Sequence, residues 1–145
     1  MLEKKKKFTS GPQLHDIVVT QVPSFVHKYI ANGHNVKSDG NCGYRTVAVQ
    51  LGKSEEEWRD VRRDCQAEIL ENQAHYEEIA NTGNEGEVVR MLSSVNWFEA
   101  KDAGRDHWMY FPEFGHVLAN RYGQPVHFYS PQMMLTFLRQ RMGLK

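Results

Sequence analysis

The segment from Ser54 to Ile69 constrains the fold of this chain more than any other part of its sequence. Ser54 is followed three residues later by Glu57, which is the pattern of a capping box at the N-terminus of a helix. Apolar residues then recur every three to four positions, at Trp58, Val61, Cys65 and Ile69. This spacing predicts a helix with one apolar face packed on a core. Cys65 lies on that face, so we interpret it as a packed thiol rather than a reactive one.

Size and charge narrow the class of protein. The chain has 145 residues, of which 40% are hydrophobic, and this is enough for one globular domain. Its 18 basic and 18 acidic residues balance, which argues against a broad surface for nucleic acid. No apolar stretch approaches the roughly 20 residues that a membrane helix needs, and no leader peptide is recognisable. We therefore expect no nucleic-acid partner, no membrane partner, and a cytoplasmic or nuclear location.

The start of the chain differs in composition from the rest. Residues 1–11 are polar and rich in lysine, which predicts a disordered basic lead-in. The lysine run at 4–7 is interpreted as a solvated tail, with a nuclear-localisation patch as the alternative. Residues 12–145 are expected to form a single domain and a monomer. The chain has two cysteines, Cys42 and Cys65, and both thiols are expected to be free in a reducing compartment.

Helix and strand patterns predict a mixed fold. Apolar spacing and capping residues predict further helices over 24–30, 43–51, 88–92 and 113–122. The run from Val126 to Tyr129 predicts a strand, and the apolar tail at 133–138 is expected to pack as either type of element. The expected fold class is therefore α/β (α+β), mostly helical, with few strands.

Cys42 stands where a turn becomes a helix. Asp39, Gly40 and Asn41 have the chemistry of a turn, and helical spacing starts directly after them. A cysteine in the first turn of a helix meets the positive end of the helix dipole and unpaired backbone N–H groups, both of which favour thiolate over thiol. Amides of the turn could bind the oxygen of a tetrahedral intermediate. The alternative is a purely structural cysteine.

The segment Asp-Gly-Asn-Cys-Gly-Tyr-Arg at 39–45 resembles the signature of the ovarian-tumour (OTU) cysteine proteases, most of whose members cleave ubiquitin conjugates. Further matches follow in order, at Trp58-x-x-Val61-Arg62 and from Trp108-Met109 through 114–122 to Pro125. This order is similar to OTU domains of plant and fungal proteins, some of them associated with transposon-derived sequences. The resemblance covers roughly residues 22–138, and it implies an OTU-like fold with helices packed on a small central sheet.

The resemblance implies roles for four residues at the turn. Cys42 becomes the nucleophile, Asp39 the acidic residue of the signature, and Gly40 and Asn41 part of the loop whose amides bind the oxyanion. The implied activity is that of a thiol hydrolase removing ubiquitin or a ubiquitin-like protein. No pair of histidines has a spacing typical of a zinc site, and we expect neither a cofactor nor a metal. For Asp39 a structural role stays open, because Asp commonly forms turns by binding its own backbone amides.

The general base is the part of the resemblance that this chain does not match. In OTU proteins the base is a histidine on a strand beyond the one matched by 125–130, whereas the last histidine here is His127. We therefore expect a domain without its last strands and with an open sheet edge. His127 is the remaining base candidate, and His116 is interpreted as a surface or boundary residue. The alternative function is a truncated or degenerate non-catalytic domain that binds ubiquitin, because losing the base removes several orders of magnitude in rate.

Overall fold

The computed structural model describes residues 22–30, 33–80, 86–130 and 132–140. The lead-in at 1–11 and the lysine run within it lie outside these ranges. The chain divides into two units, whose described parts are 22–30, 33–35, 129–130 and 132–134 for the first, and 36–80, 86–128 and 135–140 for the second. A single domain over 12–145 stays a prediction.

The first unit contains the short helix expected after Pro23. The helix η1 covers Ser24–Tyr29 and is of the 3₁₀ type, with Pro23 at its N-cap. Its single buried residue is Val26, whereas the rings of Phe25 and Tyr29 are exposed. A 3₁₀ helix has three residues per turn and seldom runs beyond about four residues, so this six-residue element is long for its type.

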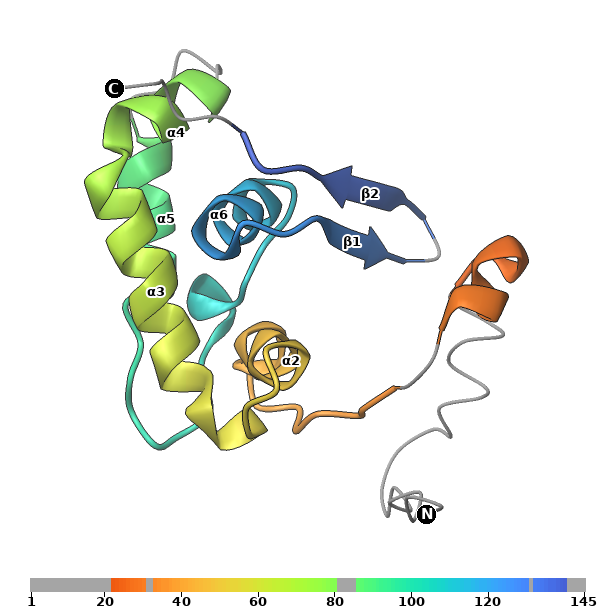
Figure 1. The fold of residues 1–145 in the computed structure, drawn as a ribbon. Coiled ribbons are helices and arrows are strands. Elements are labelled where there is room, and N and C mark those ends of the chain that lie inside the picture. Colours follow the sequence, from red (N-terminus) through yellow and green to blue (C-terminus); the bar gives the residue numbers. More distant parts are fainter. Residues whose placement is uncertain (1–21, 31–32, 81–85, 131, 141–145) are drawn as a thin grey trace. The chain divides into compact units, whose positions relative to one another are not determined.

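Helices make up most of the second unit. Its α-helices are α2 (Cys42–Gln50), α3 (Trp58–Glu71), α4 (Gln73–Ala80), α5 (Glu87–Val95) and α6 (Glu113–Tyr122), and its 3₁₀ turns are η2 (Glu55–Glu57) and η3 (Arg105–His107). The long helix α3 contacts α2, α5 and α6 (Figure 1). The core of the unit therefore forms around α3, as the pattern over 54–69 predicts.

The start of α3 confirms the capping box. The Ser54 hydroxyl accepts a hydrogen bond from the Glu56 amide at 3.2 Å, and the Glu57 carboxylate accepts one from the Ser54 amide at 2.8 Å. The first turn is the 3₁₀ turn η2, after which α3 begins at Trp58. The apolar stripe is buried as expected, with exposed fractions of 3% or less at Trp58, Val61, Cys65 and Ile69.

Of the elements after α5, the helix α6 packs against α3. The helix α6 ends at Tyr122 and is followed by its C-cap residue Gly123, whose φ of 65° is a left-handed conformation that glycine adopts without strain. The strands β1 (Val126–Tyr129) and β2 (Met134–Phe137) follow and pair as a two-stranded antiparallel sheet. This confirms the strand predicted at 126–129 and shows that the apolar tail contains a second one. The fold is a mixed helical and β structure with a small sheet.

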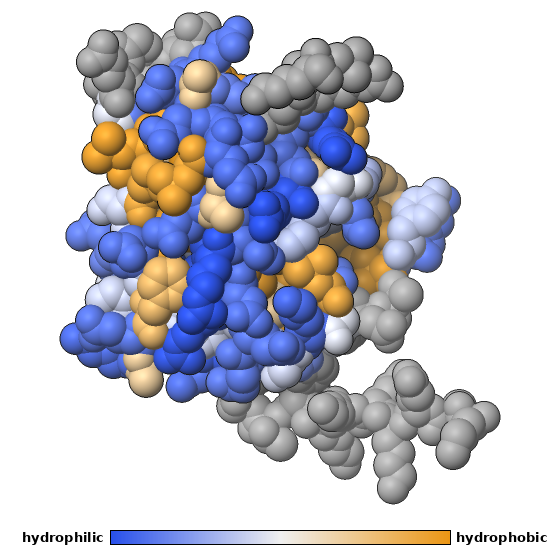
Figure 2. Space-filling model, turned by 60° about the vertical axis from the view of Figure 1, so that its left-hand side comes forward, coloured by the Kyte–Doolittle hydropathy of each residue, from blue (hydrophilic) through white to orange (hydrophobic). Residues whose placement is uncertain are grey.

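Polar residues cover most of the face of the molecule in Figure 2, and apolar residues lie there in separate patches. Within the described ranges, none of the helices has the length and apolar character needed to cross a membrane.

Candidate active site

Cys42 is the first residue of α2 and is exposed to solvent. The structure therefore confirms that the turn becomes a helix at this cysteine. The first helical hydrogen bond runs from the Arg45 amide to the Asn41 carbonyl at 2.8 Å. Amides in the first turn of a helix have no carbonyl one turn earlier to bind, so this end of α2 carries partial positive charge beside the thiol.

Asp39 forms the turn before Cys42 and is buried. Its Oδ1 accepts the Asn41 amide at 3.0 Å, and its Oδ2 accepts the Asn41 side-chain amide at 3.3 Å. Asp39 therefore has the structural role of a turn-forming residue, because its carboxylate binds a backbone amide of its own turn. The Asn41 amide is engaged inside the turn, so an oxyanion at this site would have to use other amides, beginning with that of Cys42.

Arg45 holds the Asp39 carboxylate from the side of α2. The Arg45 Nη2 lies 2.7 Å from the Asp39 Oδ2, its Nε lies 3.1 Å from Oδ1, and both side chains are almost fully buried. Burial alone would raise the pKa of Asp39, but the hydrogen bonds from Arg45 and Asn41 outweigh it and lower the pKa to about 2. Asp39 is therefore ionised at neutral pH and acts here as an acceptor.

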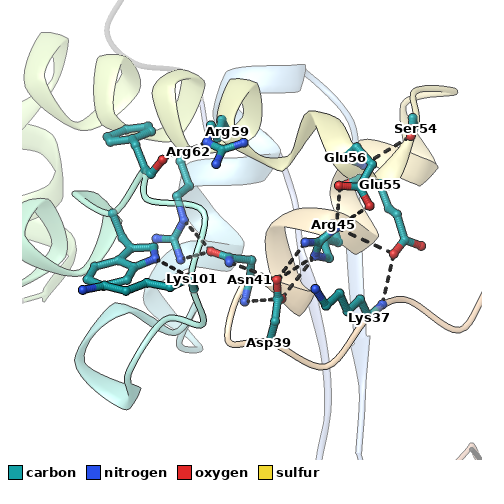
Figure 3. Close-up of polar contacts among 12 residues, drawn as sticks. Lys37, Asp39, Asn41, Arg45, Ser54, Glu55, Glu56, Arg59, Arg62 and Lys101 are labelled. Atoms are coloured by element: carbon teal, nitrogen blue, oxygen red, sulfur yellow. Dashed lines mark hydrogen bonds and ion pairs between the residues drawn. The ribbon is translucent and has the colours of Figure 1, made fainter.

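The same arginine also connects the turn to the cap of α3. Its Nη1 lies 3.2 Å from the Glu56 carboxylate and 3.3 Å from the Glu55 carbonyl oxygen. The Glu55 carboxylate in turn accepts the Lys37 amide at 3.1 Å (Figure 3). Arg45 thus joins the loop before Cys42 to the capping segment of α3, and the hydrogen bond to Asp39 raises the pKa of Arg45 further.

A second buried arginine, Arg62 on α3, holds the turn through Asn41. The Asn41 Oδ1 accepts two hydrogen bonds from Arg62, from Nη2 at 2.7 Å and from Nε at 3.1 Å (Figure 3). Asn41 is the N-cap residue of α2, yet its side chain makes no capping hydrogen bond. The amides at the start of α2 are therefore not occupied by the side chain that most often binds them at such a position.

The other bonds of Arg62 reach across the core to α5 and η3. Its guanidinium donates to the carbonyl oxygens of Ser94, Val95 and His107, at 3.2, 3.4 and 2.9 Å. Ser94 and Val95 are the last residues of α5, where helix carbonyls carry partial negative charge. A buried cation is therefore satisfied by neutral oxygens, and Arg62 connects the turn before Cys42 to two distant segments.

Gly40 allows the turn to lie against the loop at 103–108. Its φ is +81°, and a Cβ at this position would meet the Ala103 carbonyl group and the Trp108 Nε1. The contact is fixed by the Ala103 amide, which donates to the Asp39 carbonyl at 2.8 Å, and by the Trp108 Nε1, which donates to the Ala103 carbonyl at 3.2 Å. The Trp108 ring is about half exposed, at 47%. Glycine at position 40 is thus required by both conformation and space.

The base candidate His127 lies on β1 and is exposed. Its Nδ1 is 3.0 Å from the Thr136 hydroxyl on β2, so the ring is bound across the sheet. Other histidines are bound elsewhere: the His107 Nδ1 lies 3.3 Å from the Ser94 carbonyl, and the His75 Nε2 lies 2.9 Å from the Gln140 side chain. His116 is a boundary residue, as expected, with its ring packed edge-on against Phe137 and its pKa lowered by burial.

Arg45 and Arg62 both stand in the motifs that resemble OTU proteases, but neither was expected to take part in the site. A pattern that points to Arg62 is present in the chain, because it stands four residues after Trp58 and three before Cys65, on the apolar stripe of α3. A charged residue on such a stripe needs a buried partner. Its partner, Asn41, is 21 positions away, and nothing in the local pattern identifies it.

Comparison of the chain with protein-family models, with curated proteins and with solved structures finds no match. Among the residues that the structure describes, no three His, Cys, Asp or Glu side chains are grouped so that they could hold a metal ion. The candidate site therefore consists of an exposed thiol at a helix N-terminus, and a buried polar network that holds the turn before it.

Proposed function

We propose that this chain carries the nucleophile of an OTU-like thiol hydrolase, with Cys42 attacking the carbonyl at the C-terminus of ubiquitin or a ubiquitin-like protein. The observation that carries the proposal is the exposure of Cys42 as the first residue of α2, after a turn held by two buried arginines. Nucleophilic cysteines are found in such partly exposed, electropositive places, whereas structural cysteines are buried and inert, as Cys65 is.

Two further features support this proposal. The sequence motifs that resemble OTU proteases form one connected region, since the turn at 39–45, Arg62 of α3 and the loop reaching Trp108 are joined by hydrogen bonds. The N-cap side chain of α2 is turned toward Arg62, which leaves the amides of Gly43 and Tyr44 without the side chain that usually caps them, beside the Cys42 amide at the start of the helix. An amide in that place is suited to bind the oxygen of a tetrahedral intermediate.

The proposed chemistry has two steps. The Cys42 thiolate attacks the carbonyl carbon, a C–S bond forms, and the carbonyl electrons become an oxyanion that receives hydrogen bonds from backbone amides. The intermediate then expels the amine, which takes a proton, and leaves a thioester that water hydrolyses. A histidine ordinarily transfers these protons, and His127 is the candidate for this role as general base.

A second candidate function is binding of ubiquitin without turnover. The observation that favours it is the set of histidine contacts, which join His127 to Thr136, His107 to the Ser94 carbonyl and His75 to Gln140. A thiol without a base retains nucleophilicity toward strong electrophiles but loses most of its rate with amide substrates.

Covalent labelling with ubiquitin that carries a thiol-reactive group at its C-terminus tests the proposal. We expect the parent protein to gain the mass of one ubiquitin, Cys42→Ala to gain none, and the matched control Cys65→Ala to react as the parent does. Loss of labelling in His127→Ala would assign the base to His127. A folded parent that remains unlabelled would overturn the hydrolase, and saturable binding of unmodified ubiquitin by that parent would then favour the non-catalytic function.

A further inference from the structure

The side chain of Asn41 is held in an arrangement that asparagine at the start of a helix does not normally adopt. Asparagine is among the best N-cap residues, because its side-chain oxygen accepts an amide from the first turn. In this protein the Asn41 Oδ1 accepts Nη2 and Nε of Arg62, and the Asn41 Nδ2 donates to Asp39. Both ends of the side-chain amide are therefore engaged away from the helix.

The backbone of Asn41 departs from the capping arrangement as well. An N-cap residue usually has an extended backbone, with ψ well above 100°. Asn41 has φ −99° and ψ 6°, in the sparsely populated bridge region where residues of active sites are often found. Asn41 is 1% exposed, so its conformation is set by protein contacts rather than by solvent.

Arg62 is well suited to impose this conformation. It is fully buried, and its remaining donors are held by the carbonyl oxygens of Ser94, Val95 and His107. The planar guanidinium also stacks over the Tyr44 ring, with its central carbon 4.0 Å from the ring centroid. Because these contacts come from α2, α5 and η3, the guanidinium has a fixed orientation, and its two donors to Asn41 are fixed with it.

We infer that Arg62 is a positioning residue that keeps Asn41 off the N-terminus of α2, so that the first amides of the helix stay open for the charge that develops at Cys42. The inference rests on the proposed role of Cys42 as a nucleophile. Without Arg62, the Asn41 oxygen is released and caps its own helix. By the usual geometry of an N-cap, this oxygen then occupies the amide of Gly43 or Tyr44, which would otherwise stabilise the Cys42 thiolate, and Cys42 becomes less reactive.

The experiment measures the rate at which iodoacetamide alkylates Cys42 in the native protein, read from the mass of the Cys42 peptide, across a series of pH values. We expect Arg62→Met to react about fivefold more slowly near neutral pH, the size of a charge–helix interaction of about 1 kcal/mol. Its pH profile should move to higher pH. The matched control is Arg63→Met, because the Arg63 side chain is 59% exposed on the same helix and pairs with Asp60.

The decisive variant is the double replacement Arg62→Met with Asn41→Ala. Alanine cannot cap, so the double variant should regain most of the rate that Arg62→Met loses, although it has lost more hydrogen bonds. A merely structural role predicts the opposite, since a second lost contact would lower stability without restoring reactivity. A double variant as slow as Arg62→Met, or an Arg62→Met protein with the parent rate and pH profile, would overturn the inference.

If Arg62→Met does not fold, Arg62→Lys replaces it in both variants. Lysine keeps the charge but offers a single ammonium in place of the planar fork, and it cannot reproduce the two bonds to one oxygen. The same slowing and the same rescue by Asn41→Ala are expected, and their absence would again overturn the inference. The readout does not involve ubiquitin, so it can fail while labelling by the ubiquitin probe succeeds, and the reverse.

Discussion

Gly40 combines two constraints that usually occur apart. Its φ of +81° costs a residue with a side chain roughly 1–2 kcal/mol, and a Cβ would in addition press on the Ala103 carbonyl group and the Trp108 Nε1. We expect Gly40→Ala to lower the free energy of unfolding by about 3 kcal/mol or more, since overpacking adds to the conformational strain. Chemical denaturation followed by circular dichroism measures the change.

Gly52 is the matched control for this replacement. Its φ of +77° is close to that of Gly40, but a Cβ there would have nothing within 4 Å. Gly52→Ala should therefore cost only the conformational part, roughly 1–2 kcal/mol. Equal losses in the two variants would contradict the view that the loop at Ala103 presses on the turn before Cys42.

The lowered pKa of Asp39 predicts that the free energy of unfolding depends on pH in the acid range. Its pKa is about 2 in the folded protein against an ordinary 3.8, so the carboxylate stabilises the fold fully above about pH 4, and this contribution is lost as the pH falls toward 2. The shift corresponds to about 2 kcal/mol. Asp39→Asn should be less stable than the parent by about that amount at pH 7, and the difference should shrink between pH 4 and pH 2.

The control for Asp39 is a surface carboxylate with a similar partner. Asp60 lies 3.0 Å from Arg63 one turn along α3, and both side chains are about half exposed. Exposed pairs of this kind contribute at most about 0.5 kcal/mol. Asp60→Asn should thus leave the acid profile of unfolding nearly unchanged, and a profile for Asp39→Asn parallel to the parent at every pH would contradict the assignment.

At the scale of elements, the close contact between α6 and β2 depends on glycine at position 115, because glycine has no side chain. A Cβ at Gly115 would collide with the ring of Phe137, which is 5% exposed and also packs near Phe111 and His116. Alanine is otherwise favoured over glycine inside a helix by about 1 kcal/mol. The same replacement at Gly115 should therefore have opposite signs in two backgrounds.

We expect Gly115→Ala to destabilise the parent by about 1–3 kcal/mol, because the ring of Phe137 must move. In a Phe137→Ala background the obstacle is gone, and Gly115→Ala should then stabilise by up to about 1 kcal/mol. Unfolding free energies of the four proteins form a double-mutant cycle. Additive effects would show that Phe137 does not pack on Gly115 in solution.

At the scale of the whole molecule, local patterns predicted local structure. The capping box at Ser54, the stripe of α3 and the start of α2 at Cys42 each depend on residues within one or two turns, and all three are confirmed. The helix α4 was missed, because it follows α3 after the single intervening residue Asn72 and has a weak pattern of its own. The type of β2 stayed open, because a strand is defined by its partner β1.

The site was predicted in part for the same reason. The place of Cys42 and the turn-forming role of Asp39 follow from neighbouring residues. The hydrogen bonds of Arg62 join it to positions 21, 32 and 45 residues away, and only folding brings those groups together. The fold class is confirmed at the level of a mixed structure with a small sheet, whereas the OTU-like arrangement and the ubiquitin partner stay proposals.

The two cysteines differ in exposure, so the rates at which they are alkylated report two different properties of the protein. Cys42 is exposed in the native state, whereas Cys65 is fully buried on α3, and burial raises the pKa of its thiol. A reagent reaches Cys42 while the fold is intact, but it reaches Cys65 only after the helices around it separate. One sample treated with one alkylating agent therefore records two quantities at once, the chemistry of the native surface and the frequency with which the core opens.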